Sequence, residues 1–522
     1  MSTAIGYSIS DFFNRFQCYA SKLNFFSASN ENKKNLLPLF KTHNTFSNHA
    51  NGFKNKTVAV GQDLSPASIP LSQLALSRLG VARKNLPATP EVRGLMDYLH
   101  KSPTAWHATS EALNLCKEKG YTLLKEGESW KGIIQPKGKY VVERNGSSFI
   151  AFQVPSKDLQ SACVLGAHTD SPGLKLKTHP EKNVDNVTLL CPEVYGGVNP
   201  HSWFDRSLGL AGRVIYLNEN GEKCSSLIDL GKTIGTVSHL AIHLDRTLGE
   251  EHKVNAQDHL PVICWINDKQ DQQFNHFEAE LRKLVPLTKL ISHELFFVPR
   301  EQHEIVNGNQ VHGAKLDNLL GTHASLYALL ESEEPENNRL KMVVAWDSEE
   351  IGSRTYQGAD SDFLDSTLRR ITDSIGMTED AYAVMKAKSG LISVDGAHGR
   401  HPNYYAKHEP MHAPKLGEGP VLKFNANQRY SSNSDTAAWI HVAARKAGVP
   451  IQEFHVRSDL PCGSTIGNIV APKIGFRSVD IGAPMLSMHS IREHAHLEDH
   501  VNMICLLGNL LSMDLTNQYE KS

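Results

Sequence analysis

The chain has 522 residues, of which 40% are hydrophobic and 21% charged, and its formal net charge is −2. This composition is that of a globular protein with a large core, and it offers no excess of positive charge for nucleic acid or an anionic membrane. No apolar run approaches about 18 residues, so we expect no transmembrane helix. The eight cysteines show no C-x-x-C spacing, which favours reduced thiols in a cytoplasmic protein over a disulfide framework.

Residues 1–85 differ from the rest of the chain. They are rich in Asn, Ser, Lys and Phe and poor in acidic residues. They contain no charged start followed by an apolar core, so they do not resemble a secretory signal. We expect a poorly ordered N-terminal extension, with organellar targeting as the alternative, although arginine is scarce for a transit peptide.

From Leu86 onward, the pattern of apolar residues predicts helices alternating with strands. Thr89-Pro90-Glu91 is typical of a helix start, because it combines a capping hydroxyl, an early proline and an acid. Further helices are predicted over residues 104–119, 318–331, 436–446 and 499–515, and strands over 140–142, 149–152, 163–167, 342–346, 451–455 and 476–480. This alternation predicts a three-layer α/β/α domain.

Residues 174–312 have a different pattern. The alternating segments 174–177 and 187–190 indicate antiparallel strands rich in turns. We therefore expect a β-rich domain inserted between two parts of the α/β domain, residues 86–173 and 313–522.

Three acidic residues follow the apolar strand predicted at 342–346, in Asp347-Ser348-Glu349-Glu350. Clustered carboxylates repel one another and resist desolvation, and a bound cation would remove the conflict. Adjacent side chains at a strand end point in different directions, so Glu349 and Glu350 can have different roles. The alternative interpretation is a solvated, charged turn.

Four other segments also place a metal-binding type of residue after an apolar run. In an α/β sheet the carboxyl ends of the strands converge on one crevice, so these residues could meet. Each segment alone has a plainer interpretation, since His-x-Asp is often a surface pair and Leu-Asp-Asn is a common helix cap. The four segments are Ala167-His168-Thr169-Asp170, Lys315-Leu316-Asp317-Asn318, Val394-Asp395-Gly396-Ala397-His398 and Met488-His489-Ser490-Ile491-Arg492-Glu493.

The order and content of these segments resemble the aspartyl aminopeptidase family of co-catalytic zinc aminopeptidases. The resemblance covers roughly residues 87–515. It includes the motifs at 195–197 (YGG), 203–206 (WFDR), 407–409 (KHE), 425–430 (NANQRY) and 459–467 (DLPCGSTIG).

The resemblance implies two zinc ions per chain, with Mn²⁺ or Co²⁺ as substitutes, bridged by Asp317. One ion would also be held by His168 and Asp395, and the other by Glu350 and His489. Imidazole and carboxylate are common zinc ligands, and three protein ligands per ion leave a position for water. Glu349 would be the general base, and Asp170 would orient His168.

The resemblance also assigns residues that contact substrate. His201 would reach the active site of a neighbouring subunit. The family more often has glycine and an aromatic residue before this histidine and threonine after it, whereas here Val198-Asn199-Pro200 precedes it and Ser202 follows it. A solvent-exposed histidine is the alternative for His201. Lys423 matches the family's pocket lysine for an acidic side chain, and an exposed strand lysine is the alternative. Arg429, Tyr430 and His398 are further candidates for the substrate pocket.

The resemblance therefore implies a metalloaminopeptidase that removes N-terminal Asp or Glu from peptides. It also implies a homo-oligomer, a dodecamer built from dimers of the inserted domain. The same fold with another substrate, as a neutral or basic aminopeptidase or a metal-dependent deacylase, is the first alternative. A scaffold or receptor without catalytic activity is the second, and it predicts the loss of a ligand or of the base, all six of which are present.

Overall fold

The computed structural model describes residues 86–156, 158–249, 253–268, 275–333 and 338–515. The N-terminal extension predicted over residues 1–85, with Cys18, lies outside these ranges. The other seven cysteines have free thiols, as expected. None of the helices in these ranges has the length and apolar character needed to cross a membrane.

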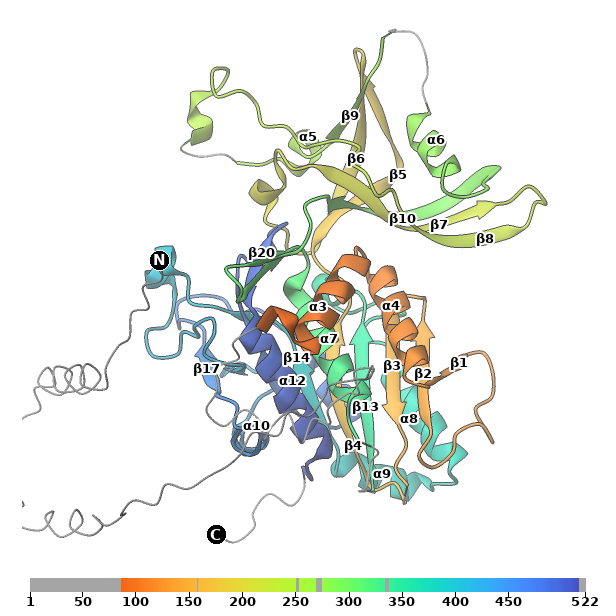
Figure 1. Cartoon of the computed structure of the whole chain (residues 1–522), viewed down its shortest axis with the longest axis vertical. Helices are drawn as coiled ribbons and strands as arrows, with labels where there is room; N and C mark the ends of the chain where they lie inside the picture. Colours follow the sequence, from red (N-terminus) through yellow and green to blue (C-terminus); the bar gives the residue numbers. More distant parts are fainter. Residues whose placement is uncertain (1–85, 157, 250–252, 269–274, 334–337, 516–522) are drawn as a thin grey trace, which may run out of the picture. The chain divides into compact units, whose positions relative to one another are not determined.

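The α/β body of the chain has a mixed sheet of nine strands as its middle layer (Figure 1). The strands lie in the spatial order β1-β2-β3-β13-β4-β14-β18-β16-β17. Its four central strands, β13, β4, β14 and β18, are mutually parallel. The strands are β1 (Thr122–Leu124), β2 (Lys139–Arg144), β3 (Ser148–Gln153), β4 (Ser161–His168), β13 (Arg339–Trp346), β14 (Gly390–Val394), β16 (Val421–Phe424), β17 (Gln452–His455) and β18 (Arg477–Gly482).

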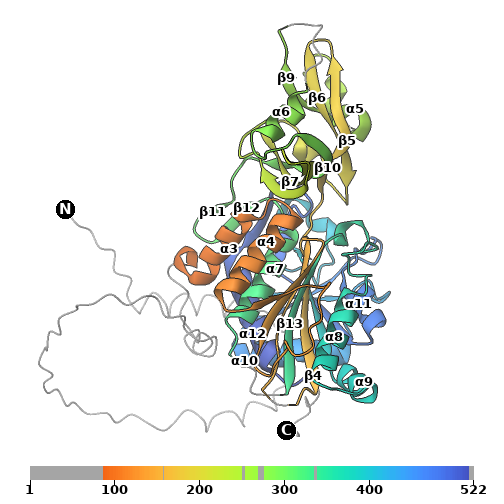
Figure 2. The ribbon, with the colours of Figure 1, turned by 90° about the vertical axis from the view of Figure 1, so that its right-hand side faces the viewer.

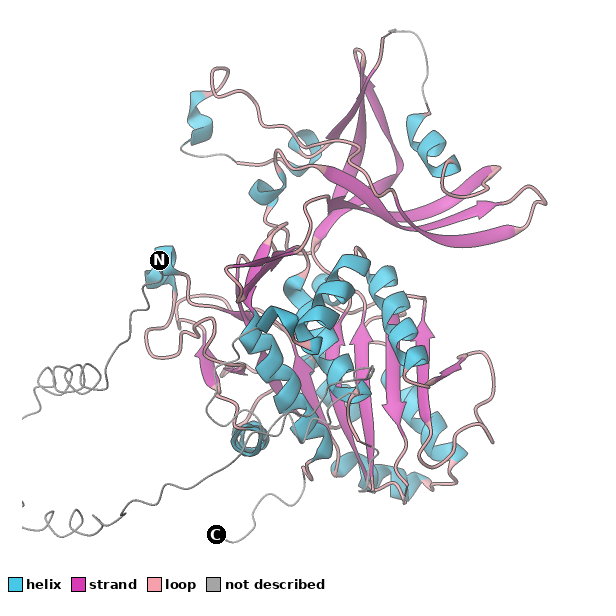
Figure 3. Ribbon diagram, viewed as in Figure 1, coloured by secondary structure: helices cyan, strands magenta, loops and turns pink. Residues whose placement is uncertain are grey.

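Helices cover both faces of this sheet (Figures 2 and 3). Successive strand residues point to opposite faces, so Val164 of β4 packs in one core and Leu165 in the other. The core that contains Leu165 includes α3 (Pro90–Lys101), α4 (Ala105–Glu118), α7 (Leu316–Leu330), α10 (Ser434–Ala447) and α12 (Leu497–Ser512), and the core that contains Val164 includes α8 (Phe363–Ser374), α9 (Glu379–Ala387) and α11 (Gly467–Ile474). The predicted three-layer α/β/α architecture is therefore confirmed.

The predicted helices and strands of this body agree with the structure to within about three residues at each end. The start of α3 is as predicted, with the Thr89 hydroxyl accepting a hydrogen bond from the Val92 N–H. Helices α8, α9 and α11 were not predicted. Their apolar residues, such as Phe363 and Leu368 of α8, pack in the core that contains Val164.

A second, six-stranded antiparallel sheet forms most of the region predicted as the insertion, in the order β8-β7-β10-β5-β6-β9. It has its own apolar core, which includes Trp203 and Phe297. The elements are β5 (Gly173–Val184), β6 (Val187–Tyr195), β7 (Leu208–Leu217), β8 (Lys223–Asp229), β9 (Val262–Ile266), β10 (Lys289–Pro299), α5 (Ala256–His259) and α6 (His276–Arg282), with short 3-10 helices η2 (Pro200–Trp203) and η3 (Arg246–Gly249).

A third sheet, of five strands in the order β11-β12-β20-β19-β15, brings together distant parts of the chain. Its strands are β11 (Glu304–Val306), β12 (Gln310–Gly313), β15 (Ala397–His398), β19 (Pro484–Leu486) and β20 (Glu493–His496). Residues 304–312, predicted as part of the inserted domain, therefore belong to this third sheet and not to the six-stranded one, because β11 pairs with β12 and β12 pairs with β20. Three more 3-10 helices are η1 (Leu86–Ala88), η4 (Glu349–Ile351) and η5 (Pro402–Lys407).

Candidate metal centre

Three of the predicted site segments lie side by side at one edge of the nine-stranded sheet. Strands β13, β4 and β14 are adjacent and parallel, and their carboxyl ends carry Glu349 and Glu350, His168, and Asp395. The register pairs Trp346 with His168, so the two strands end at the same level. The apolar strands are fully buried, and the polar residues begin where each strand ends.

The other two predicted ligands reach the same edge from elsewhere in the fold. Asp317 lies at the start of α7 and is 3% exposed. His489 follows β19, in the left-handed backbone region with φ +66°. A residue other than glycine rarely adopts such a conformation, which is found mostly where the surrounding structure imposes it, often at functional sites.

The five predicted ligands form two groups that share Asp317. His168, Asp317 and Asp395 make one group, and Asp317, Glu350 and His489 make the other, with ligand atoms in each group within 4.8 Å of one another. The Nε2 atom of His168 lies 3.5 Å from Oδ1 of Asp317, whereas Nε2 of His489 lies 3.4 Å from its Oδ2. The two oxygens of one carboxylate therefore face two different imidazoles.

The remaining distances between ligand atoms within these two groups are similar. His168 Nε2 is 3.4 Å from Oδ1 of Asp395, and His489 Nε2 is 3.3 Å from Oε1 of Glu350. Glu349 belongs to a third group, with His168 and Glu350. The structure thus brings Glu349 and all five predicted ligands to one place.

The electrostatics of this cluster fit a bound cation. Burial raises the pKa of Glu350 to about 7 and the pKa of Glu349 well above its usual value, because carboxylates are costly to bury together. Burial opposes protonation of His489, but its contacts with Asp317 and Glu350 raise its pKa to about 11. Oδ1 of Asp317 is buried and accepts no hydrogen bond from the described residues. A divalent cation would satisfy this oxygen and offset the acidic charge.

Both imidazoles are oriented by backbone carbonyls. Nδ1 of His168 lies 3.1 Å from the carbonyl oxygen of Asp170, and Nδ1 of His489 lies 2.9 Å from that of Gly197. A carbonyl only accepts, so each Nδ1 carries the hydrogen and each Nε2 is left for a metal.

Asp170 has a wider role than the sequence analysis gave it. Its carboxylate is 3.4 Å from Nδ1 of His168, but it also accepts hydrogen bonds from the N–H groups of Glu349 (3.1 Å) and Glu350 (3.2 Å) and from the hydroxyl of Tyr195 (2.8 Å). Asp170 therefore ties the predicted base and its neighbouring ligand to the end of β4.

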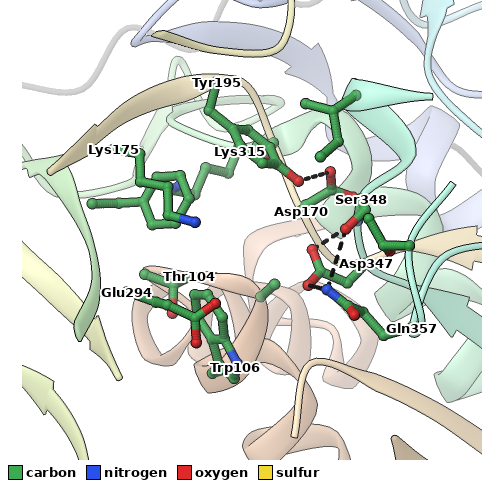
Figure 4. Close-up of a pocket in the computed structure, with 15 residues that line it drawn as sticks. Thr104, Trp106, Asp170, Lys175, Tyr195, Glu294, Lys315, Asp347, Ser348 and Gln357 are labelled. Atoms are coloured by element: carbon green, nitrogen blue, oxygen red, sulfur yellow. Dashed lines mark hydrogen bonds between the residues drawn. The ribbon is translucent and has the colours of Figure 1, made fainter. Parts of the chain in front are cut away.

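A cavity of about 160 Å³ lies beside Asp170 (Figure 4). Its walls include Tyr195, whose hydroxyl donates to Asp170, and Gln357, whose amide donates to Asp347. None of the five predicted ligands lines it. Asp170 and Ser348, which adjoin the ligand residues, do line it.

The predicted pocket residues differ in exposure. Lys423 is 1% exposed, and its Nζ donates to the carbonyls of Gly396 (3.0 Å) and Asp395 (3.3 Å) and lies 5.0 Å from the ring centroid of Tyr430. Arg429 is exposed, with one long hydrogen bond of 3.4 Å to Gly463. His398 is exposed and packs edge-on against Phe454. The alternative of an exposed strand lysine therefore does not hold for Lys423.

His201 is exposed on η2. The segment around it is joined to the His489 loop, because Asn199 N–H donates to the carbonyl of His489 and Ile491 N–H donates to the hydroxyl of Ser202. It is not a member of the ligand groups found among the described residues.

Sequence reasoning missed two residues of this site. Glu493 accepts hydrogen bonds from the backbones of Asp317 and His489, and Gly197 orients the imidazole of His489. Both occur in the motifs quoted above, but as members of a pattern and without a role. Their contacts involve backbone atoms, and those of Glu493 with Asp317 and of Gly197 with His489 join distant parts of the chain, so residue type gives no signal for them.

Comparison with known proteins finds a family and relatives that match most of the chain. The model of the family described as "Aminopeptidase I zinc metalloprotease (M18)" matches residues 98–510. A "Probable M18 family aminopeptidase 2" from Pseudomonas aeruginosa (strain UCBPP-PA14) is 41% identical over 424 residues, covering 80% of this chain and 96% of the relative. One from Azotobacter vinelandii is 40% identical over 431 residues, covering 81% and 98%.

Solved structures show the same fold. The chain resembles one in the cryo-EM structure of the Ape4 and Nbr1 complex with a TM-score of 0.79 and 32% identity, covering 83% of this chain and 87% of that one. It resembles the S. cerevisiae mApe1 dodecamer with a TM-score of 0.70 and 25% identity, covering 80% and 95%.

Proposed function

The chain belongs to the aminopeptidase I zinc metalloprotease (M18) family and is a metalloaminopeptidase, and on this premise we propose that it uses two zinc ions to remove N-terminal Asp or Glu from peptides. The observation that carries the two-zinc proposal is the position of Asp317, whose two oxygens face His168 and His489 separately. A bridging carboxylate of this kind is typical of two-metal hydrolases.

The roles of the five ligands follow from the two groups. His168, Asp317 and Asp395 would hold one ion, and Asp317, Glu350 and His489 the other. When bound, zinc would polarise the scissile carbonyl and lower the pKa of a water molecule.

Glu349 is the proposed general base. Its N–H is held by Asp170, and its carboxyl group lies beside His168 and Glu350 without being needed in either ligand group. A carboxylate at this place can take up a proton from water and later deliver it to the leaving amine. Asp170 fixes the backbone of Glu349 next to the end of β4, which carries His168.

Acidic specificity is proposed from two positively charged residues, Lys423 beside Asp395 and Arg429. The ammonium of Lys423 is bonded to two neutral carbonyls, and the nearest oxygen of the Asp395 carboxylate is 3.8 Å away, so its charge is only partly offset. Arg429 is exposed and can move toward a substrate carboxylate. His398 and Tyr430 are proposed to line the same pocket.

A different side-chain specificity is the second candidate, because Lys423 is 1% exposed and already makes two hydrogen bonds. In that case Lys423 would hold the Asp395–Gly396 loop and not bind the substrate.

We also propose that the chain assembles into a homo-oligomer through the six-stranded sheet, as the S. cerevisiae relative assembles into a dodecamer. Exposed His201 would then serve the active site of a neighbouring subunit. Residues 86–173 and 313–522 would form the catalytic domain.

The test is hydrolysis of a matched set of peptides with N-terminal Asp, Glu, Ala or Lys, and of an acetylated Asp peptide. We expect cleavage of the free Asp and Glu peptides only, and loss of that activity when a chelator removes zinc. Faster cleavage of Ala or Lys peptides would reject the acidic specificity, and cleavage of the acetylated peptide would point to a deacylase or endopeptidase. Full activity without metal would reject the zinc mechanism.

A further inference from the structure

Glu493 joins the backbones of two predicted metal ligands. Its Oε1 accepts a hydrogen bond from the N–H of His489 (2.8 Å), and its Oε2 accepts one from the N–H of Asp317 (3.0 Å). Asp317 and Glu493 are 176 positions apart in the chain, so this contact fixes two distant segments against each other. The side chain is 1% exposed, so water does not compete for its two oxygens.

Both segments have backbone conformations that need external support. His489 has φ +66°, and Lys315, two residues before Asp317, has φ +61°. Such left-handed residues are costly unless neighbouring groups hold them. The carboxylate of Glu493 bonds directly to the left-handed residue His489 itself.

Glu493 is itself firmly placed. It is the first residue of β20, which pairs with β12 on one side and β19 on the other, and it lies opposite Gly313 in the β12 register. The side chain therefore extends from a paired strand to the start of α7, which carries Asp317, and to the segment after β19, which carries His489.

Asp170 makes a similar pair of contacts with two other residues of the site. It accepts hydrogen bonds from the N–H groups of Glu349 and Glu350, as Glu493 does from those of Asp317 and His489. Each carboxylate thus holds two backbone groups of residues that face the crevice. Neither needs to contact the metal to control its ligands.

We propose that Glu493 is a positioning residue for zinc, because it sets the separation of Asp317 and His489. This separation determines how tightly the group formed by Asp317, Glu350 and His489 binds zinc. The inference rests on the proposed two-zinc site. Residues that orient metal ligands typically change metal affinity about 10- to 100-fold when replaced.

The test compares Glu493→Gln with Glu498→Gln, an exposed acid five residues away on α12. Glutamine keeps the size of Glu493 but offers one acceptor oxygen, so it can hold only one of the two N–H groups. Zinc per chain is measured in a series of zinc buffers, together with the melting temperature of each protein with and without zinc.

We expect wild type and Glu498→Gln to bind two zinc ions per chain. Compared with these two proteins, Glu493→Gln should need a zinc concentration about 10- to 100-fold higher to fill its weaker site. Its melting temperature should also rise less than theirs when zinc is added. If the metal-free Glu493→Gln protein does not melt cooperatively, the titration is made on Glu493→Asp, which keeps the charge but is one methylene shorter. The same increase in the zinc concentration needed to fill the weaker site is expected for Glu493→Asp.

Two results would overturn the inference, and they differ. Two zinc ions bound with unchanged affinity in the Glu493 variant, with only a lower melting temperature of the metal-free protein, would mean that Glu493 is merely structural. Fewer than two zinc ions in the wild type would reject the proposed two-zinc function, and the inference with it.

Discussion

The Nδ1 atom of His489 lies 2.9 Å from the carbonyl oxygen of Gly197. Gly197 follows β6 of the six-stranded sheet, whereas His489 belongs to the predicted metal centre at the edge of the nine-stranded sheet. A backbone atom of the inserted region therefore orients a predicted ligand. The insertion contributes to the site within one chain, besides any role that it has in assembly.

Replacement of Gly197 by alanine tests this contact. A Cβ atom at position 197 would lie 3.1 Å from Nδ1 of His489, close enough to displace the imidazole by a few tenths of an ångström. We expect kcat/KM to fall about tenfold, because a small displacement of a metal ligand weakens both metal binding and substrate alignment. Gly127→Ala is the control, since no atom lies within 4 Å of its Cβ. Equal kcat/KM and zinc content in the two variants would show that the contact is unimportant.

The part of this site that sequence reasoning could predict is the part carried by side chains at strand ends. His168 ends one fully buried strand, and Asp395 and Glu349 come soon after two others; polar residues at the end of such a run stand out in a sequence. Asp317 and His489 lie after shorter and less buried strands, β12 and β19, and the family resemblance supplied their roles as ligands. The M18 family match confirms that resemblance.

Contacts through backbone atoms could not be predicted in this way. Any residue can provide the carbonyl that Gly197 offers to His489, and the N–H groups held by Glu493 carry no sequence signal. The pairing of β12 with β20 depends on how the chain returns after the insertion, so the predicted boundary at residue 312 did not anticipate it. The burial of Lys423 likewise depends on Tyr430 and the Asp395–Gly396 carbonyls packing around it.

Substitution of Lys423 by methionine tests the proposed acidic specificity. Methionine keeps much of the apolar stem but removes the positive charge, so the ratio of kcat/KM for Asp over Ala peptides should fall at least about tenfold. Arg429→Gln is made in parallel, because Arg429 is the other cation of the proposed pocket. If only Arg429→Gln changes the ratio, Lys423 holds the loop and Arg429 recognises the substrate; an unchanged ratio in both variants would refute the proposed pocket.

A pair of buried histidines outside the metal centre predicts a loss of stability in acid. Nδ1 of His323, on α7, lies 3.0 Å from Nε2 of His500, on α12, and both residues are at most 2% exposed. Burial lowers the pKa of His500 to about 3 and that of His323 well below its usual value. In the unfolded chain both imidazoles would titrate near pH 6.5.

The direction of the pH effect follows from these values. Below about pH 6.5, His500 takes up a proton in the unfolded chain but not in the folded one. With respect to His500, the free energy of unfolding is therefore highest above pH 6.5 and decreases as the pH falls toward 3. At pH 5, proton uptake by His500 in the unfolded chain lowers the free energy of unfolding by about 2 kcal/mol.

His500→Gln keeps a hydrogen-bonding partner for His323 but removes one titrating group. In urea unfolding, we expect the decrease in the free energy of unfolding from pH 7 to pH 5 to be about 2 kcal/mol smaller than in His441→Gln, a half-exposed control. The same decrease in both variants would show that His500 does not set the acid sensitivity.

The most direct test of the proposed mechanism is Glu349→Gln, with zinc content and hydrolysis measured on the same sample. Glutamine has the size of glutamate but cannot accept the proton, so kcat for the Asp peptide should fall about 10²- to 10⁴-fold. Because Glu349 is needed in neither ligand group that shares Asp317, the variant should still hold two zinc ions per chain. Glu379→Gln, an exposed acid on α9, is the control and should retain full activity. Undiminished hydrolysis by Glu349→Gln with both zinc ions bound would contradict the assignment of Glu349 as the general base.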